Sequence, residues 1–197
     1  MAISTGYGFR PVQLLGGKAF SGGTIREFVV TPAAASHGIY NGDLMNSALG
    51  VVLPVAAAPA SGTLSTNTPI GVAVGVRFTD PVLKQTQHAN FLPATSTGYA
   101  SIFAKIVDDP DVLFQVRADT ANLTYTSIGK NCTLATYVEG NTTNGVSAVY
   151  VTGIATTSTL PFRIVDVLTS STDGSTYTDI IVKYNWNTHQ YHLPTGA

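Results

Sequence analysis

Charged side chains are scarce in this chain. Only 11% of its 197 residues are Asp, Glu, Lys or Arg, whereas 44% are hydrophobic, and a typical soluble domain is about one quarter charged. Much of the surface must therefore consist of uncharged polar and small side chains. Such a surface suits lasting contact with other proteins, and it offers little to an active site that works by electrostatics.

Basic runs are also missing. Ten Lys and Arg stand against eleven Asp and Glu, which gives a net charge of −1. Proteins that bind nucleic acid neutralise phosphates with clustered Lys and Arg. We therefore expect no direct contact with nucleic acid.

No hydrophobic run is long enough to cross a membrane. The longest apolar stretch, residues 49–60, contains Pro54 and Pro59, whereas a spanning helix needs about 20 apolar residues. The first residues also lack the basic and apolar regions of a signal peptide. These absences predict a protein that is made in the cytoplasm and has no membrane partner.

Cysteine occurs once, at Cys132, so an intrachain disulfide is excluded. The cysteine lies at an apolar position of a strand-like run, where a buried and inert thiol is favoured over a nucleophile.

Motifs for catalysis are missing as well. The sequence contains no serine-hydrolase, zinc-protease, phosphate-loop or dinucleotide-binding signature. His189 and His192 are expected on opposite faces of a final strand, which disfavours a metal site. The one acidic cluster, Asp108, Asp109 and Asp111, lies between two strand patterns, so a turn is favoured over a calcium or acid–base site. We expect no enzyme, no metal and no cofactor.

A repeat of period two runs through most of the chain and predicts β-strands. Two hairpins are expected, one around Asp173-Gly174 and one around residues 140–145 (GNTTNG). No segment combines helical periodicity with caps at both ends. The sequence therefore predicts an all-β fold, a single antiparallel β-sandwich or barrel of jelly-roll-like type. The clearest alternating sets are Val72, Val74, Val76 and Phe78; Ile102, Ala104 and Ile106; Val112, Phe114 and Val116; and Ile180, Val182 and Tyr184.

The first 24 residues differ from the rest. Glycines and a proline alternate there with large apolar side chains, which argues against both regular structure and a disordered tail. We expect an extended N-terminal arm, residues 1–24, that orders against something else, and a β-domain over residues 25–197.

Four segments in the first 119 residues carry a resemblance to a known family. They are TGYGFRPVQLLGGKAFSGG (5–23), IYNGDLM (39–45), IGVAVGVRFTDP (70–81) and AKIVDDPDVLFQVRAD (104–119). Together they resemble the head decoration, or cement, proteins of tailed bacteriophages, especially the minor capsid proteins of short-tailed marine phages.

The resemblance implies a β-rich structural protein on the outer surface of the virion capsid. Such proteins bind an assembled icosahedral shell, often as homotrimers at local three-fold positions, and stabilise it without catalysis or cofactor. The implied partners are the major capsid protein and further copies of this chain. The arm would then reach a coat or neighbouring subunit through these partner-binding residues: Tyr7, Phe9, Arg10, Leu14, Leu15 and Phe20.

Other functions remain open. A main coat protein of a small jelly-roll virus usually carries a basic arm, and here only Arg10 and Lys18 are basic within residues 1–24. A tail-fibre or receptor-binding module is the stronger alternative, with Trp186, Tyr191 and His192 as a stacking platform for carbohydrate. Packing at a sheet edge is the simpler interpretation of these aromatic residues. A polysaccharide depolymerase is a distant third, because no convincing carboxylate pair is present.

Overall fold

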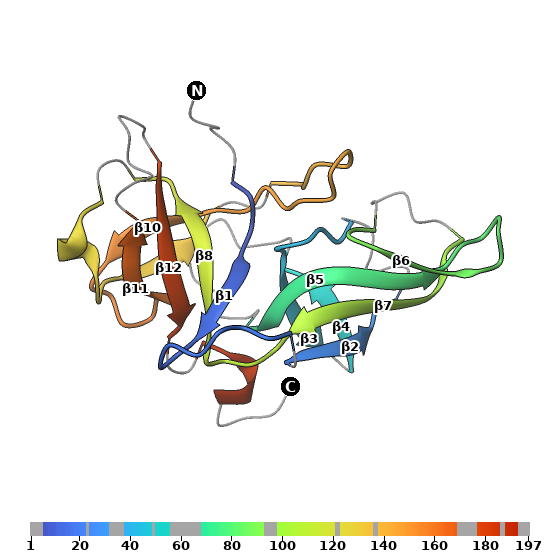
Figure 1. Cartoon of the computed structure of the whole chain (residues 1–197), viewed down its shortest axis with the longest axis horizontal. Coiled ribbons are helices and arrows are strands. Elements are labelled where there is room, and N and C mark those ends of the chain that lie inside the picture. Colours follow the sequence, from blue (N-terminus) through green and yellow to red (C-terminus); the bar gives the residue numbers. More distant parts are fainter. Residues whose placement is uncertain are drawn as a thin grey trace.

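The computed structural model describes residues 6–22, 24–31, 38–48, 50–55, 68–92, 98–120, 123–135, 138–168, 177–185 and 188–192. Twelve strands arranged in two sheets make up this part of the chain, and the only helical segments within it are short 3-10 turns (Figure 1). The predicted all-β class is confirmed.

The first sheet closes into a barrel. Its strand order is β1-β8-β10-β9-β11-β12, and β12 pairs back onto β8, so that five strands form a ring and β1 extends one edge of β8. The pairs are antiparallel except for a short parallel contact between β8 and β10. The strands are β1 (Arg10–Leu14), β8 (Val112–Ala118), β9 (Asn131–Leu134), β10 (Val151–Ala155), β11 (Phe162–Leu168) and β12 (Thr178–Tyr184).

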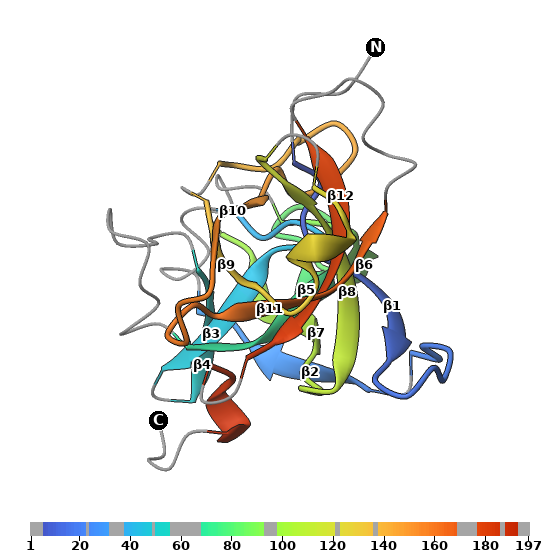
Figure 2. The same ribbon diagram turned by 90° about the vertical axis from the view of Figure 1, so that its left-hand side faces the viewer.

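The second sheet, also of six strands, lies beside the barrel along the long axis of the molecule, and Figure 2 shows the pair from the barrel end. Its order is β2-β7-β5-β3-β4, and β6 pairs with the far end of the long strand β5. The strands are β2 (Ile25–Val29), β3 (Leu44–Ala48), β4 (Val51–Pro54), β5 (Pro69–Thr79), β6 (Thr86–Ala89) and β7 (Ala100–Val107).

Both predicted hairpin pairings occur. Strands β11 and β12 are antiparallel from Phe162↔Tyr184 to Leu168↔Asp179, and the turn residues Asp173-Gly174 lie outside the described residues. Strands β9 and β10 are also antiparallel. They are shorter than expected, because residues 138–150 form a long loop instead of continuing the strands.

The side chains of β5 do not all face the side that the sequence predicts. Alternating residues of 72–78 were expected on a single face, but the pairing with β7 shifts register just after Ala73, where Val74 is inserted. An inserted residue reverses the alternation of side chains beyond it. Val72 and Val74 consequently pack against the barrel core, whereas Val76 packs in the core of the second sheet. The shift lets one strand serve two cores.

The remaining alternating sets are confirmed, because each faces one core and is at most 4% exposed. Cys132 also lies in the barrel core with no exposed surface, and burial raises the pKa of its thiol to about 12. The predicted burial of the cysteine is thus confirmed. The second-sheet set is Ile102, Ala104 and Ile106, and the barrel sets are Val112, Phe114 and Val116 with Ile180, Val182 and Tyr184.

The acidic cluster forms the turn that the sequence predicts. Asp109 Oδ1 accepts a hydrogen bond of 2.9 Å from the backbone N–H of Asp111, at the point where β7 of one sheet leads into β8 of the other. The third carboxylate, Asp108, is 5% exposed and accepts hydrogen bonds from Arg26 and from the Tyr191 hydroxyl. These acidic residues therefore build the junction between the sheets.

Candidate assembly surface

The residues expected in an N-terminal arm lie against the barrel instead. Strand β1 pairs with β8 through residues 10–14, and Phe9 has no exposed surface. Leu14 and Phe20 are partly buried and pack against the barrel core. Residues 6–22 are thus an integral part of the fold, and residues 1–5 lie outside the described part of the chain.

Packing of Phe9 explains this placement. Its ring lies 4.9 Å from that of Phe162 and 6.3 Å from that of Phe114, measured between centroids. The preceding Gly8 has φ +74°, and a Cβ built on it would clash with Gly42 and Ser147. Gly6 and Gly8 therefore permit a close approach between backbones, and they do not signal an extended arm.

Only part of the predicted partner-binding set faces solvent. Leu15 is 48% exposed and Arg10 is also exposed. Tyr7 is half-buried, with the Arg10 guanidinium carbon 4.3 Å from the centre of its ring. Among the predicted residues, Arg10 and Leu15 are the best placed to meet another molecule.

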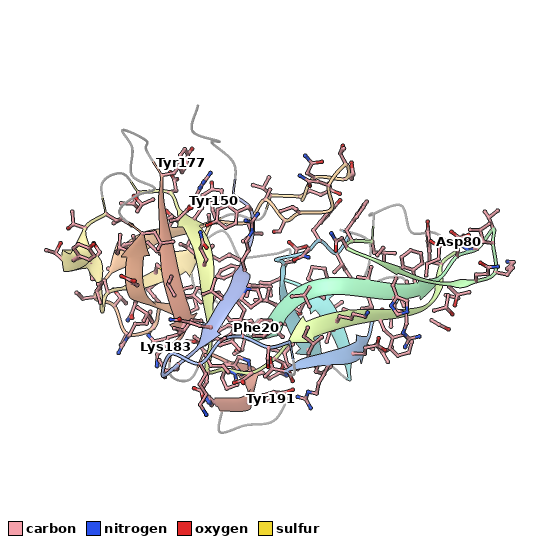
Figure 3. The ribbon with its side chains drawn as sticks, in the orientation of Figure 1. Phe20, Asp80, Tyr150, Tyr177, Lys183 and Tyr191 are labelled. Atoms are coloured by element: carbon pink, nitrogen blue, oxygen red, sulfur yellow. The ribbon has the colours of Figure 1, made fainter. Side chains whose placement is uncertain are left out.

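Two highly exposed apolar side chains of the described residues lie elsewhere, at the tip of the β5–β6 hairpin. Val82 is 84% exposed and Leu83 58% exposed. The hairpin projects away from the barrel at one end of the molecule (Figure 1), and Asp80, which begins its turn, lies at that end (Figure 3). Two adjacent apolar groups at a protruding tip make it a candidate for contact with another protein.

The tip is held in one conformation by Asp80. Its Oδ1 atom accepts hydrogen bonds from the backbone N–H groups of Val82 (2.7 Å) and Leu83 (2.8 Å). Its backbone N–H donates to the Gln85 carbonyl, and its carbonyl accepts from the Lys84 N–H, both at 3.0 Å. Because the turn is already ordered, little conformational entropy remains to be lost when the two side chains are buried.

Exposed apolar side chains also occur on the edge strands. Val12 of β1 is 37% exposed, and Ile25 and Val29 of β2 are 37% and 47% exposed. Edge strands with exposed apolar groups are natural sites of protein association. Together with the hairpin tip, these residues define the candidate assembly surface.

The C-terminal segment differs from the expected final strand. After β12 the chain forms a 3-10 turn, η4 (Gln190–His192), and the rings of His189 and His192 lie 5.9 Å apart instead of on opposite faces. Among the described residues, no three His, Cys, Asp or Glu side chains gather as metal ligands. Trp186 of the proposed stacking platform lies outside those residues, and Tyr191 is 48% exposed.

Because His189 is buried, we expect the folding stability of the protein to depend on pH. Burial is the main cause that lowers its pKa from 6.5 to about 4; His192 adds to this, while Asp108 and Asp109 oppose it. A lowered histidine pKa favours folding above pH 6.5, and that contribution is lost as the pH falls toward 4.

Buried Asp43 changes the stability with pH in the opposite direction. Burial raises its pKa from 3.8 to about 6, so its contribution to stability is present below pH 3.8 and is lost as the pH rises through 6.

Urea unfolding of the wild type and of His189→Gln at pH 7 and pH 4.5 separates the effect of His189 from that of Asp43. We expect the wild type to lose more stability than the His189→Gln variant when the pH falls from 7 to 4.5. Equal losses in the two proteins would contradict the role of His189.

Comparison with known proteins gives no relative. No protein-family model, curated protein or solved structure matches this chain. Within the part of the chain that the structure describes, no helix has the length and apolar character needed to cross a membrane. Functional inference therefore rests on the residues themselves.

Sequence reasoning missed the hairpin tip. Its signal is present in the segment TDPVLKQT (79–86), where two apolar residues follow an Asp-Pro turn start. Turn positions are ordinarily filled by Gly, Asn, Asp, Ser and Pro. Apolar residues are unusual at such positions, and this departure is the signal that could have singled out the tip.

Proposed function

We propose that this protein is a structural virion protein that binds the outside of a tailed-phage capsid and stabilises it. The observation that carries the proposal is the ordered hairpin tip with exposed Val82 and Leu83. The low charge of the chain supports it, because few ions must lose their hydration when the surface is covered. The proposal assigns no catalytic role and no cofactor.

The proposed partner of the tip is the major capsid protein. Complete burial of a Val or Leu side chain is worth about 1.5–3 kcal/mol, so one tip alone gives weak binding. A symmetric shell offers many equivalent positions, and linked copies bind with much higher avidity than single ones. Weak apolar contacts of this kind therefore suffice for a protein that covers a shell.

A homotrimer would supply that linkage. The exposed apolar residues of the edge strands β1 and β2 are the proposed contacts between copies. Light scattering of the purified chain tests this. We expect a mass about three times the 20.6 kDa of the chain. A monomeric mass at all concentrations would argue against a trimer that forms before the protein binds the shell.

Co-sedimentation with shells tests the proposed function directly. Purified protein is added to mature capsids that lack it, and the bound amount is measured by gel after sedimentation. We expect saturable binding and greater resistance of the shells to heat. Absence of binding to capsids, together with binding to isolated tails, would favour a receptor-binding or tail-fibre module.

A further inference from the structure

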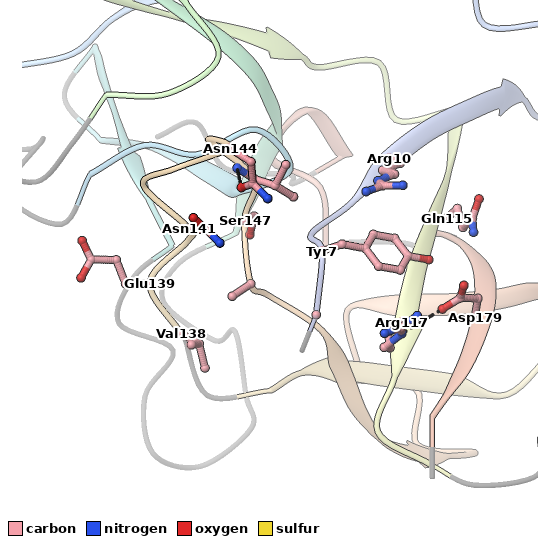
Figure 4. Close-up of a pocket in the computed structure, with 13 residues that line it drawn as sticks. Tyr7, Arg10, Gln115, Arg117, Val138, Glu139, Asn141, Asn144, Ser147 and Asp179 are labelled. Atoms are coloured by element: carbon pink, nitrogen blue, oxygen red, sulfur yellow. Dashed lines mark hydrogen bonds and ion pairs between the residues drawn. The ribbon is translucent and has the colours of Figure 1, made fainter. Parts of the chain in front are cut away.

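A cleft of about 690 Å³ opens between the barrel and the loop of residues 138–148. Its barrel side comes from Tyr7, Arg10 and β8 and β12 residues, and its other side comes from the loop (Figure 4). This volume lies within the range of sites that hold small ligands, and such sites often form where two packed units meet. The hairpin tip that carries the proposed shell contact is not part of it.

The loop side of the cleft is held in place by backbone hydrogen bonds. The Asn141 N–H donates to the Val146 carbonyl at 2.8 Å, and the Ser147 N–H donates to the Asn41 carbonyl at 2.9 Å. The loop is thereby anchored both to itself and to a segment next to the second sheet. The cleft is therefore preformed and does not depend on a ligand to order it.

Donors and acceptors both line the cleft. Arg10, Arg117 and the loop amides can donate, the Asp179 and Glu139 carboxylates can accept, and Glu139 Oε1 already accepts from the Tyr40 hydroxyl at 3.0 Å. Asn141 and Asn144 each use their Oδ1 atom to accept a backbone N–H within the loop, from Thr143 at 2.8 Å and from Val146 at 3.0 Å. Their Nδ2 groups are then the side-chain atoms that remain to donate. Such oriented amides suit a ligand that is rich in oxygen acceptors.

Tyr7 adds a buried hydroxyl to the cleft. This oxygen lies near Gln115 and Asp179, but it makes no hydrogen bond of normal geometry. Burial, followed by Asp179, raises its pKa well above the ordinary value of 10, so the hydroxyl keeps its proton at neutral pH. A buried hydroxyl whose contacts with Gln115 and Asp179 fall short of a well-formed hydrogen bond is costly, and a ligand oxygen would supply a better one.

Charge distinguishes the two arginines of the cleft. Arg117 forms an ion pair of 3.1 Å with Asp179, whereas Arg10 is exposed and forms no ion pair with another described residue. Stacking on Tyr7 holds the Arg10 guanidinium at the cleft. An arginine presented in this way suits a single carboxylate, which it can bind through two parallel hydrogen bonds.

We propose that this cleft binds an acidic saccharide, with its carboxylate on Arg10 and its ring hydroxyls on Tyr7 and the loop amides. Sugar hydroxyls both donate and accept, so they fit a cleft that offers donors from Asn141 and Asn144 and an acceptor from Asp179. Val138, Val146 and Ala148 supply apolar contacts for the carbon face of a sugar ring. The inference does not rest on shell binding.

Calorimetric titration with a galacturonic acid disaccharide tests the proposal. The neutral galactose disaccharide of the same linkage and inorganic phosphate serve as comparison probes. We expect one-to-one binding of the acidic sugar, at least about tenfold weaker binding of the neutral one because a charge-assisted hydrogen bond is lost, and no displacement by equimolar phosphate.

Substitutions then locate the site. Arg10→Gln is expected to weaken acidic-sugar binding at least about tenfold, and Tyr7→Phe, which keeps the ring, several-fold. Lys18→Gln removes the same charge at an exposed position outside the cleft and is expected to change nothing. Absence of binding at millimolar sugar, equal binding by Arg10→Gln and Lys18→Gln, or displacement by equimolar phosphate would each overturn the proposal.

Discussion

Replacing Phe9 with alanine is expected to lower the free energy of unfolding by about 3–5 kcal/mol, the range for removing a buried Phe ring. Phe9 has no exposed surface and packs between the rings of Phe114 and Phe162. The surrounding strands are tied together around the barrel, so they are poorly able to collapse into the space left behind. Urea unfolding followed by circular dichroism measures the loss.

Leu15→Ala provides the matched control, because Leu15 lies in the same N-terminal segment but is 48% exposed. Its effect is expected to stay within about 0.5 kcal/mol, as is usual for surface positions. Equal stability of the two variants would mean that Phe9 is not part of the barrel core and that residues 6–22 form an arm after all.

Polar replacement of the hairpin tip is expected to abolish shell binding without unfolding the protein. The double variant Val82→Ser/Leu83→Ser removes apolar burial worth at least about 3 kcal/mol, or roughly a hundredfold in affinity for each contact. Both side chains are exposed, and the Asp80 hydrogen bonds that order the turn go to backbone N–H groups. Co-sedimentation with capsids measures the effect.

Tyr125→Ser/Ile128→Ser is the control for this variant. Tyr125 and Ile128 are 65% and 43% exposed and lie by the 3-10 turn η2 (Tyr125–Ser127), at the end of the barrel away from the hairpin (Figure 1). We expect this variant to bind shells like the wild type. If both double variants bind equally well, the tip is not the contact.

The fold could be predicted where local pattern decides the structure. In β7, β8 and β12 each alternating apolar set faces a single core, so period two in the sequence translates directly into burial. The Asp108–Asp111 turn followed from the residue types alone, since Asp and Pro favour turns in any context. These features need no information from distant parts of the chain.

Features that depend on distant partners could not be predicted. The burial of Phe9 requires Phe114 and Phe162, which follow it by more than one hundred positions. The inserted residue in β5 reflects the need of one strand to serve two cores, and no local pattern encodes that need. The cleft likewise combines β1, β8 and β12 with a loop whose turn alone was visible in the sequence.

Several of the few charged side chains form ion pairs with one another. The described residues show three ion pairs, which join Arg26 to Asp108, Arg77 to Glu27 and Arg117 to Asp179. Several of the few charges are thus neutralised within the chain. Apolar side chains at the hairpin tip and the edge strands are left to make the proposed contacts, and these require little desolvation of charge.

Electron cryomicroscopy of the virus particle that carries this protein tests the central proposal most directly. We predict density for the barrel and the second sheet on the outer face of the head, repeated with the symmetry of the shell, with the Val82–Leu83 tip in contact with the coat. Density confined to the tail, or a head surface without this protein, would contradict the proposal.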